Sequence, residues 1–207
     1  MRKSREEAAE TRKRIVRAAA REFREKGIVA TGLADLMKAA GLTHGGFYKH
    51  FASKDQLVAE ATVAAMDSIL EELAAHPTVN SAVAAYLSTR HRDNPASGCP
   101  LAALGGELAR SDKKARAAAT AGFVRLVDIL AGKARTADVR RRALVAAATM
   151  IGAVTMSRVV SDPKLSVEIL GAAEKNLGRQ RSGESDRPQA STPVENSLRR
   201  DRAWCAR

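Results

Sequence analysis

Helical hydrophobic periodicity runs through most of this chain. Apolar residues recur at intervals of three and four, which is the spacing of one helix face, and Gly, Pro or polar clusters interrupt the pattern. No segment shows the alternation that a half-buried strand requires. The fold class is therefore expected to be all-α, with about nine helices. The predicted helices cover approximately residues 5–26, 33–40, 43–51, 54–74, 78–90, 100–110, 112–131, 136–160 and 164–177.

The segment LADLMKAAGLTHGGFYKHFASKDQL, residues 33–57, is the most informative part of the sequence. It predicts two short helices joined by a tight turn, followed at once by a third helix. Gly41 is expected to end the first helix, because glycine readily adopts a positive φ. The Thr43 hydroxyl is expected to cap the second. This layout is a helix-turn-helix, whose second helix enters the DNA major groove.

The same segment resembles the DNA-binding domain of the TetR/AcrR family of transcriptional repressors. The resemblance rests on AGLT at 40–43, FYKHF at 47–51 and SKD at 53–55, all in one register. These strings match the family's turn, the end of its recognition helix and the step into a long helix.

The resemblance also implies a domain organisation. A three-helix DNA-binding domain would cover residues 1–53, with the helix-turn-helix at about 32–51, and a helical effector-binding and dimerisation domain would cover 54–177. Residues 178–207 lack periodicity and are rich in Gly, Ser, Pro, Arg and Glu, so they are expected to form a disordered tail.

Candidate DNA contacts lie in and beside the predicted recognition helix. Gly45 and Gly46 would let its backbone approach DNA closely, although they could simply loosen the turn. Lys54 begins a helix, where backbone amides already favour phosphate. The resemblance implies phosphate contacts at Tyr48 and His50, with a structural cap as the alternative for His50. The full predicted set is Thr31, Thr43, His44, Gly45, Gly46, Tyr48, Lys49, His50 and Lys54.

Base recognition cannot follow the commonest pattern here. Specific contacts usually use Arg, Asn or Gln in bidentate geometry, and this helix contains none of them. His44, Lys49, water-mediated contacts or DNA shape must then supply the specificity. Phe47 and Phe51, four residues apart on one face, are expected to belong to the core.

The charge distribution agrees with a polyanionic partner. The chain has a net charge of +12, and residues 1–58 hold 13 Lys or Arg against 7 Asp or Glu. Ordinary solvated surface charge is the alternative. The basic start of the first helix, including Arg2, Arg5 and Arg12, could reach phosphates or a minor groove, or could be a frayed arm.

Cysteine, histidine and hydropathy patterns exclude other classes. Cys99 and Cys205 form no disulfide framework, and no Cys/His set has zinc spacing, so neither a metal nor a cofactor is expected. The N-terminus has no signal-peptide pattern, and no run of 18 apolar residues occurs. These features predict a cytoplasmic protein with no membrane segment.

Cys99 is a candidate for effector or redox sensing. It directly precedes Pro100, which suits the first turn of a helix. A thiol at a helix N-terminus has a lowered pKa and raised reactivity. The resemblance adds that some family members sense electrophiles through a cysteine in a comparable place. The alternative is an inert, small, buried residue.

The last two predicted helices, 136–177, are expected to form a homodimer. Residues 143–157 are small and apolar, and Ala146, Ala147, Gly152 and Ala153 would allow helices to approach closely. The resemblance implies that these helices pair with their copies as a four-helix bundle.

The predicted function is a ligand-responsive transcriptional repressor that a small-molecule effector releases from double-stranded operator DNA. One rival is a small helical enzyme or sensor, but the four His residues have no matching Asp or Cys spacing, so no enzyme is expected. A second rival is an architectural DNA-binding protein without an effector.

Overall fold

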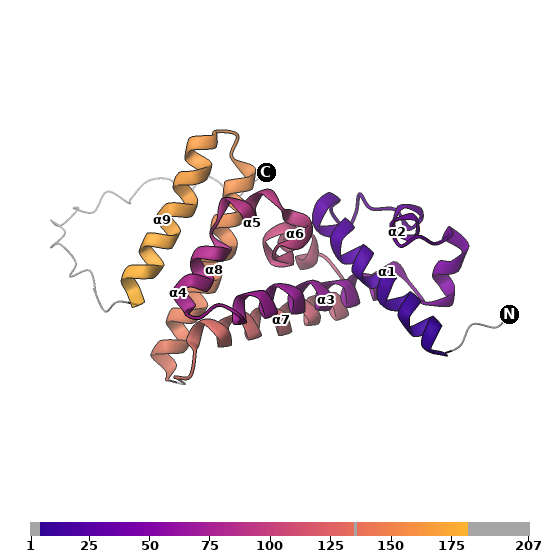
Figure 1. The fold of residues 1–207 in the computed structure, drawn as a ribbon, viewed down its shortest axis with the longest axis horizontal. Coiled ribbons are helices and arrows are strands. Elements are labelled where there is room, and N and C mark those ends of the chain that lie inside the picture. Colours follow the sequence, from indigo (N-terminus) through magenta and orange to yellow (C-terminus); the bar gives the residue numbers. More distant parts are fainter. Residues whose placement is uncertain (1–4, 135, 182–207) are drawn as a thin grey trace, which may run out of the picture.

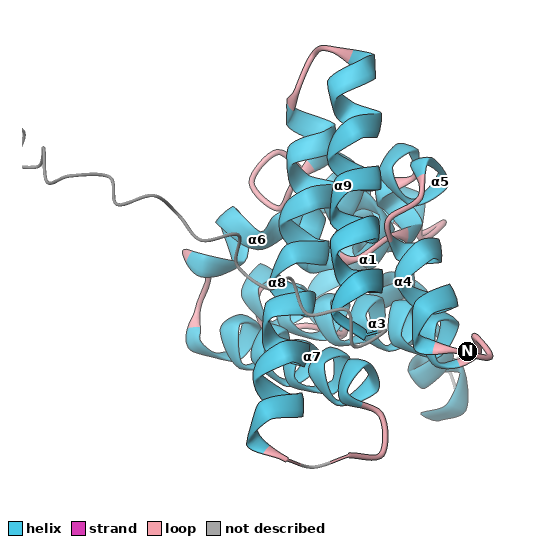
Figure 2. Ribbon diagram, turned by 90° about the vertical axis from the view of Figure 1, so that its left-hand side faces the viewer, coloured by secondary structure: helices cyan, strands magenta, loops and turns pink. Residues whose placement is uncertain are grey.

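The computed structural model describes residues 5–134 and 136–181, and over these ranges every regular element is a helix (Figures 1 and 2). The all-α fold class is confirmed for this part of the chain. The elements are α1 (Arg5–Lys26), α2 (Leu33–Ala39), the 3₁₀ helix η1 (His44–Lys49), α3 (Lys54–Ala74), α4 (Val79–Tyr86), α5 (Thr89–Asp93), the 3₁₀ helix η2 (Pro95–Ser97), α6 (Pro100–Ala109), α7 (Lys113–Ala131), α8 (Ala137–Val159) and α9 (Pro163–Arg181).

Most helix boundaries follow local sequence signals. Gly41 has a φ of 69° where the turn after α2 requires it. The Asp112 side chain accepts a hydrogen bond from the Ala115 amide at the start of α7, and Thr136 caps α8 in the same way. Pro100 occupies the first position of α6.

Two predicted boundaries are wrong. The segment expected as one helix over 78–90 is divided into α4 and α5. The Ser88 hydroxyl accepts a hydrogen bond from the His91 amide, so Ser88 caps a new helix inside the predicted one. The predicted loop 92–98 consequently contains the end of α5 and η2. At the C-terminus, α9 continues to Arg181, so the tail cannot begin at 178; residues 182–207, like 1–4, lie outside the described part.

The helices bury two hydrophobic cores. We call α1, α2 and η1 the head, and α3 to α9 the body (Figure 1). The head core includes Ile15, Phe23 and Phe47, and the body core includes Met66, Tyr86 and Met150.

Two helices contribute to both cores. Helix α6 places Leu104 and Leu108 in the head core, but Ala102 in the body core. Helix α3 is divided in the same way, with Leu57 in the head core and Ile69 in the body core. The head is therefore joined to the body through α3 and α6.

Helix α8 is, among the described helices, the one that has the length and hydropathy of a membrane span. Its Ala146, Ala147, Met150 and Val154 are buried in the body core. One part of the apolar surface of α8 therefore belongs to the body core, while Val145, Met156 and Val159 of the same helix are exposed.

Candidate DNA-binding site

The predicted recognition helix is a 3₁₀ helix, η1, rather than a longer α-helix. The Gly46 amide bonds to the Thr43 carbonyl at 3.1 Å, which is the tighter spacing of this helix type. Two glycines in six residues weaken α-helical propensity. The predicted Thr43 cap is wrong, because Thr43 holds the N-cap position without a side-chain hydrogen bond.

One side of η1 is packed and the other is open. Phe47 and Phe51 are buried, with ring centroids 5.6 Å apart, so their prediction as core residues is confirmed. Tyr48 is 69% exposed. Thr43, His44, Gly45 and Lys49 are also exposed, while Gly46 and His50 are partly buried. Five of the predicted contacts, namely Thr43, His44, Gly45, Tyr48 and Lys49, are therefore exposed on η1 and at its N-cap.

Gly45 has no packing explanation within the protein. A Cβ atom built on Gly45 would have no neighbour within 4 Å. At Gly46 the same atom would meet the Met37 side chain at 3.4 Å. The open space in front of Gly45 is what a closely docked partner would occupy.

Thr31 and Lys54 each donate a hydrogen bond within the protein, although both were predicted to contact phosphate. Thr31 is buried, and its hydroxyl donates to the Gly27 carbonyl at 2.6 Å, while Gly32 takes the N-cap position of α2. The Lys54 Nζ donates to the Ile28 carbonyl at 2.6 Å. Both side chains thus hold the turn between α1 and α2. Thr31 is buried, so we assign it to positioning the head, whereas Lys54 is only partly buried and its ammonium has two further N–H groups, so its contact with phosphate stays a prediction.

Arg12 also points inward, whereas the sequence suggested that it could reach DNA. Its guanidinium donates to the His50 carbonyl at the end of η1 and pairs with Glu60 of α3. It also lies 4.1 Å from the centroid of the Phe51 ring. Arg12 therefore ties the end of the recognition helix to α1 and α3, a role that its basic character alone could not indicate.

Replacement of Arg12 by Met is expected to weaken DNA binding about tenfold without unfolding the protein. The substitution removes the contacts with His50 and Glu60 but keeps much of the side-chain volume. Arg17→Met is the matched control, since Arg17 lies on the same helix and pairs with exposed Glu10. Fluorescence anisotropy with labelled duplex would measure both. Equal binding by the two variants would contradict the positioning role.

Cys99 lies in the body and is buried, with 1% of its surface exposed. Burial raises the pKa of its thiol, and the Tyr86 hydroxyl and the first backbone amides of α6 oppose this effect only in part. The expected lowering of the pKa is therefore wrong, because desolvation outweighs the helix N-terminus. The structure favours the alternative of an inert buried residue.

His91, which sequence reasoning did not single out, is the most constrained polar side chain near Cys99. Its Nδ1 donates to the Tyr86 carbonyl at 2.6 Å, and its Nε2 accepts from the Cys99 amide at 2.9 Å. This arrangement requires a neutral ring, because a carbonyl can only accept and an amide N–H can only donate. Burial lowers the pKa of His91, and the charges of Arg158 and Arg24 also lower it, against opposing contributions from the Tyr86 carbonyl and Glu72.

The pKa of His91 predicts an acid-sensitive stability. The unfolded chain takes up a proton on His91 near its ordinary pKa of about 6.5, whereas the folded protein takes it up only at lower pH. The free energy of unfolding should therefore fall as pH decreases below about 6.5. Urea unfolding can be measured at several pH values between about 7.5 and 5.5. Over this range the free energy of unfolding should decline more steeply for the native protein than for His91→Gln. Parallel curves would exclude the effect.

Comparison with known proteins agrees with this geometry. The model of the "Bacterial regulatory proteins, tetR family" matches residues 15–61. TtgR of Pseudomonas putida is 47% identical over 58 residues, which are 28% of this chain and 28% of TtgR. AcrR of Shigella flexneri is 44% identical over 59 residues, or 28% of this chain and 27% of AcrR. The alignments thus span less than a third of the length of these curated relatives.

Solved structures extend the likeness to most of the chain. A TetR transcriptional regulator from Chloroflexus aurantiacus has a TM-score of 0.67 and 28% identity, and the match covers 86% of this chain and 96% of that one. Reduced NemR from E. coli also has a TM-score of 0.67, at 19% identity, over 81% of this chain and 95% of NemR. The second likeness concerns the fold alone.

The head, its exposed η1 surface and the helical body define a helix-turn-helix DNA-binding regulator. The family model, the curated relatives and the Chloroflexus aurantiacus structure agree that the chain carries a DNA-binding head of the tetR family and is similar to TetR/AcrR transcriptional regulators.

Proposed function

We propose that this protein is a homodimeric repressor that binds a near-palindromic operator and is released from it by a small-molecule effector. The observation that carries the proposal is the open surface at the start of η1, where Gly45 faces empty space beside exposed His44 and Tyr48. In a cytoplasmic regulator, that surface would meet the major groove.

The proposed DNA contacts divide by the chemistry they offer. Tyr48 and His50 would bind phosphate, and Gly45 with Gly46 would let the backbone approach. His44 and Lys49 would reach base edges or backbone, and Thr43 would offer a free hydroxyl. With few bidentate groups available, shape and deformability of the operator would contribute to specificity.

The proposed dimer surface lies on α8 and α9. Apolar side chains there are 42–69% exposed in a single chain, namely Val145, Met156, Val159, Leu165 and Val167. On α8, Val145, Gly152, Met156 and Val159 recur at helical spacing and are all exposed. A second copy would bury this surface with two-fold symmetry. Ala146, Ala147 and Ala153, predicted to face a partner, instead belong to the chain's own core.

Met156→Glu is expected to yield monomers that bind operator DNA at least tenfold more weakly, because the dimer would bury an unpaired carboxylate. Val124→Glu is the matched control, since Val124 is an exposed apolar residue of α7, outside the proposed surface. Light scattering gives the mass, and anisotropy gives the affinity. A fully active Met156→Glu dimer would place the interface elsewhere.

Selection of duplexes from a random DNA pool tests the function itself. The enriched sequences should contain two related half-sites, with centres roughly 34–36 Å apart, occupied by two chains. Effector binding and DNA binding must then weaken each other by the same factor, by thermodynamic linkage. Sites without two-fold symmetry, together with binding that no small molecule alters, would favour the architectural alternative.

A further inference from the structure

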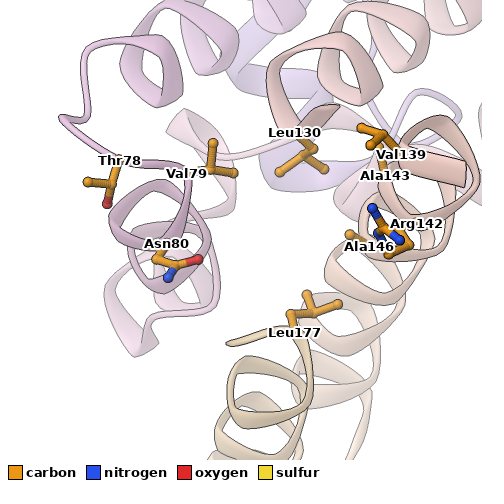
Figure 3. A pocket seen from close by; sticks show the side chains of 9 residues that line it. All are labelled: Thr78, Val79, Asn80, Leu130, Val139, Arg142, Ala143, Ala146 and Leu177. Carbon is orange, nitrogen blue, oxygen red and sulfur yellow. The ribbon is translucent and has the colours of Figure 1, made fainter. Parts of the chain in front are cut away.

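Among the cavities of the body, two of similar size differ in their relation to the head. The first, of about 400 Å³, lies among the start of α4, the end of α7, the start of α8 and the end of α9 (Figure 3). Val79, Leu130 and Leu177 are among its lining residues. The turn between α7 and α8 lies at the end of the body away from the head (Figure 1). The second cavity, of about 410 Å³, lies between α3, α4 and the α5–η2 segment.

The second cavity borders the contact that joins the head to the body. Gly98 lines it, and the Gly98 carbonyl accepts a hydrogen bond of 2.7 Å from Arg24 Nη1 of α1. Arg24 is 8% exposed, and its Nε donates to the Ala20 carbonyl, so its guanidinium bonds to two backbone carbonyl oxygens. Burial lowers the pKa of Arg24 to about 10. A buried guanidinium without its hydrogen-bond partners is costly. A shift of the Gly98 carbonyl should therefore move α1 with it, because this keeps the hydrogen bond to Arg24.

His91 lies between the cavity and Gly98. The His91 ring forms part of the cavity lining and packs on Gly98 so closely that a Cβ there would lie 2.5 Å from His91 Cδ2. The ring also holds the Cys99 amide and contacts the Tyr86 ring edge-to-face, with centroids 4.4 Å apart. A ligand that moved this ring would therefore move the backbone at 98–99.

Helix α6 connects this segment to a second contact with the head. It starts directly after Cys99, and near its end the Glu107 carboxylate accepts hydrogen bonds from the Ile28 and Val29 amides at 3.1 and 2.8 Å. These amides lie in the turn between α1 and α2, which Lys54 also holds. The head is thus attached near both ends of α6, and a shift at Gly98 would reorient it.

The polar groups of the second cavity indicate the charge of its ligand. Asn94 and Ser97 already use their side chains on backbone carbonyls of the same segment. Glu72, His76 and Arg90 are further polar lining groups. Glu72 and Arg90 have opposite charges and both are exposed, so the lining carries no net charge that would favour an ion of either sign. An uncharged molecule with donors and acceptors avoids the cost of desolvating an ion.

The apolar part of the lining indicates the remaining chemistry. Ile69 and Leu73 contribute aliphatic surface, and Tyr86 and His91 contribute rings. A volume of about 410 Å³ lies within the range of small-molecule sites, roughly 300–1,000 Å³. An aromatic ligand could pack on the aliphatic surface and against the rings.

We propose that this cavity is the effector site, that it takes an uncharged aromatic molecule with hydrogen-bonding groups, and that it controls DNA binding through the Gly98–Arg24 contact. This inference rests on the proposed function, because it assigns the site and chemistry of the effector. The first cavity then has no part in release.

Two dyes with the same ring system test the ligand chemistry. Phenylnaphthylamine is uncharged, whereas anilinonaphthalenesulfonate adds one sulfonate, and both fluoresce when they enter an apolar site. The uncharged dye should bind the native protein at least tenfold more tightly. Tighter binding of the sulfonate would overturn the proposed chemistry.

Filling each cavity separately tests the location. Ala85→Trp and Ser97→Trp each place an indole at the second cavity, and Asn80→Trp does so at the first. Each of the first two variants should lose at least tenfold in affinity for phenylnaphthylamine, and the Asn80 variant less than twofold. Circular dichroism would confirm folding, and two independent variants protect against one that misfolds. Loss only in Asn80→Trp would overturn the site.

Removing the hydrogen bond between Arg24 and the Gly98 carbonyl tests whether this contact couples the cavity to DNA binding. Saturating phenylnaphthylamine should weaken binding of selected operator DNA by the native protein at least fivefold. Arg24→Met should bind the dye normally, yet its DNA affinity should respond less than twofold. An undiminished response in Arg24→Met would exclude this route. Failure of the native protein to bind any selected DNA would instead refute the proposed function. The dye experiments would still show whether the second cavity binds an uncharged aromatic molecule.

Discussion

Gly45→Val is expected to reduce operator affinity at least a hundredfold while the fold is retained. A Cβ at Gly45 has no neighbour within 4 Å, so the larger side chain fits the free protein without a clash. In the proposed complex the same space is occupied by DNA, and the two branched methyl groups would hold the backbone away from the groove. The loss therefore arises on binding rather than on folding.

Gly105→Val provides the matched control for this variant. Gly105 lies exposed on α6, and a Cβ there also has no neighbour within 4 Å. Circular dichroism and thermal melts should show both variants folded, and anisotropy against selected operator and scrambled duplex should separate them. If Gly45→Val binds its operator like the native protein, η1 does not dock through its first turn.

Gly122→Val is expected to destabilise the protein by about 1–3 kcal/mol, which corresponds to a fall in melting temperature of roughly 2–12 °C. Gly122 of α7 packs on α3, and a Cβ there would lie 2.5 Å from Met66 Cγ and 3.0 Å from Met66 Cβ. Met66 is 1% exposed, so it has little room to move. The overlap outweighs the modest gain in helix propensity over glycine.

A double-mutant cycle identifies the cause of this destabilisation. Met66→Ala alone should cost about 2–5 kcal/mol by leaving a cavity. In the double variant the valine would occupy part of that space. The destabilisation of the double variant should therefore be smaller than the sum of the two single destabilisations by about 0.5–3 kcal/mol. Strictly additive costs would show that Met66 is not what Gly122 accommodates. Gly105→Val again serves as the neutral control.

The sequence by itself determined the features that depend on neighbours along the chain. The turn after α2 needs a residue that tolerates positive φ, and Gly41 provides it. Asp112 and Thr136 cap helices through amides three residues away. The spacing of Phe47 and Phe51 placed them together in the head core. Each of these signals involves residues only a few positions apart, so the turn, the caps and the aromatic pair could be predicted without the fold.

Two errors arose because a second effect outweighed the local signal that the sequence shows. Ser88 lies within an apolar helical pattern, yet its hydroxyl caps a new helix. Cys99 lies at a helix N-terminus, which lowers a thiol pKa, but burial raises it and has the larger effect. Burial depends on how α4, α6 and α8 pack, which periodicity does not specify.

Only the tertiary structure decided where the long polar side chains point. Arg12 and Lys54 were equally suited by sequence to phosphate, but the fold brings carbonyls of His50 and Ile28 within their reach. Arg24 and Glu107 find their partners more than 70 residues away. A buried donor must be satisfied by whatever acceptor the packing supplies, and that acceptor has no signature near the donor in the chain. The sequence thus determined that a DNA-binding head exists, and the packing determined how that head is held.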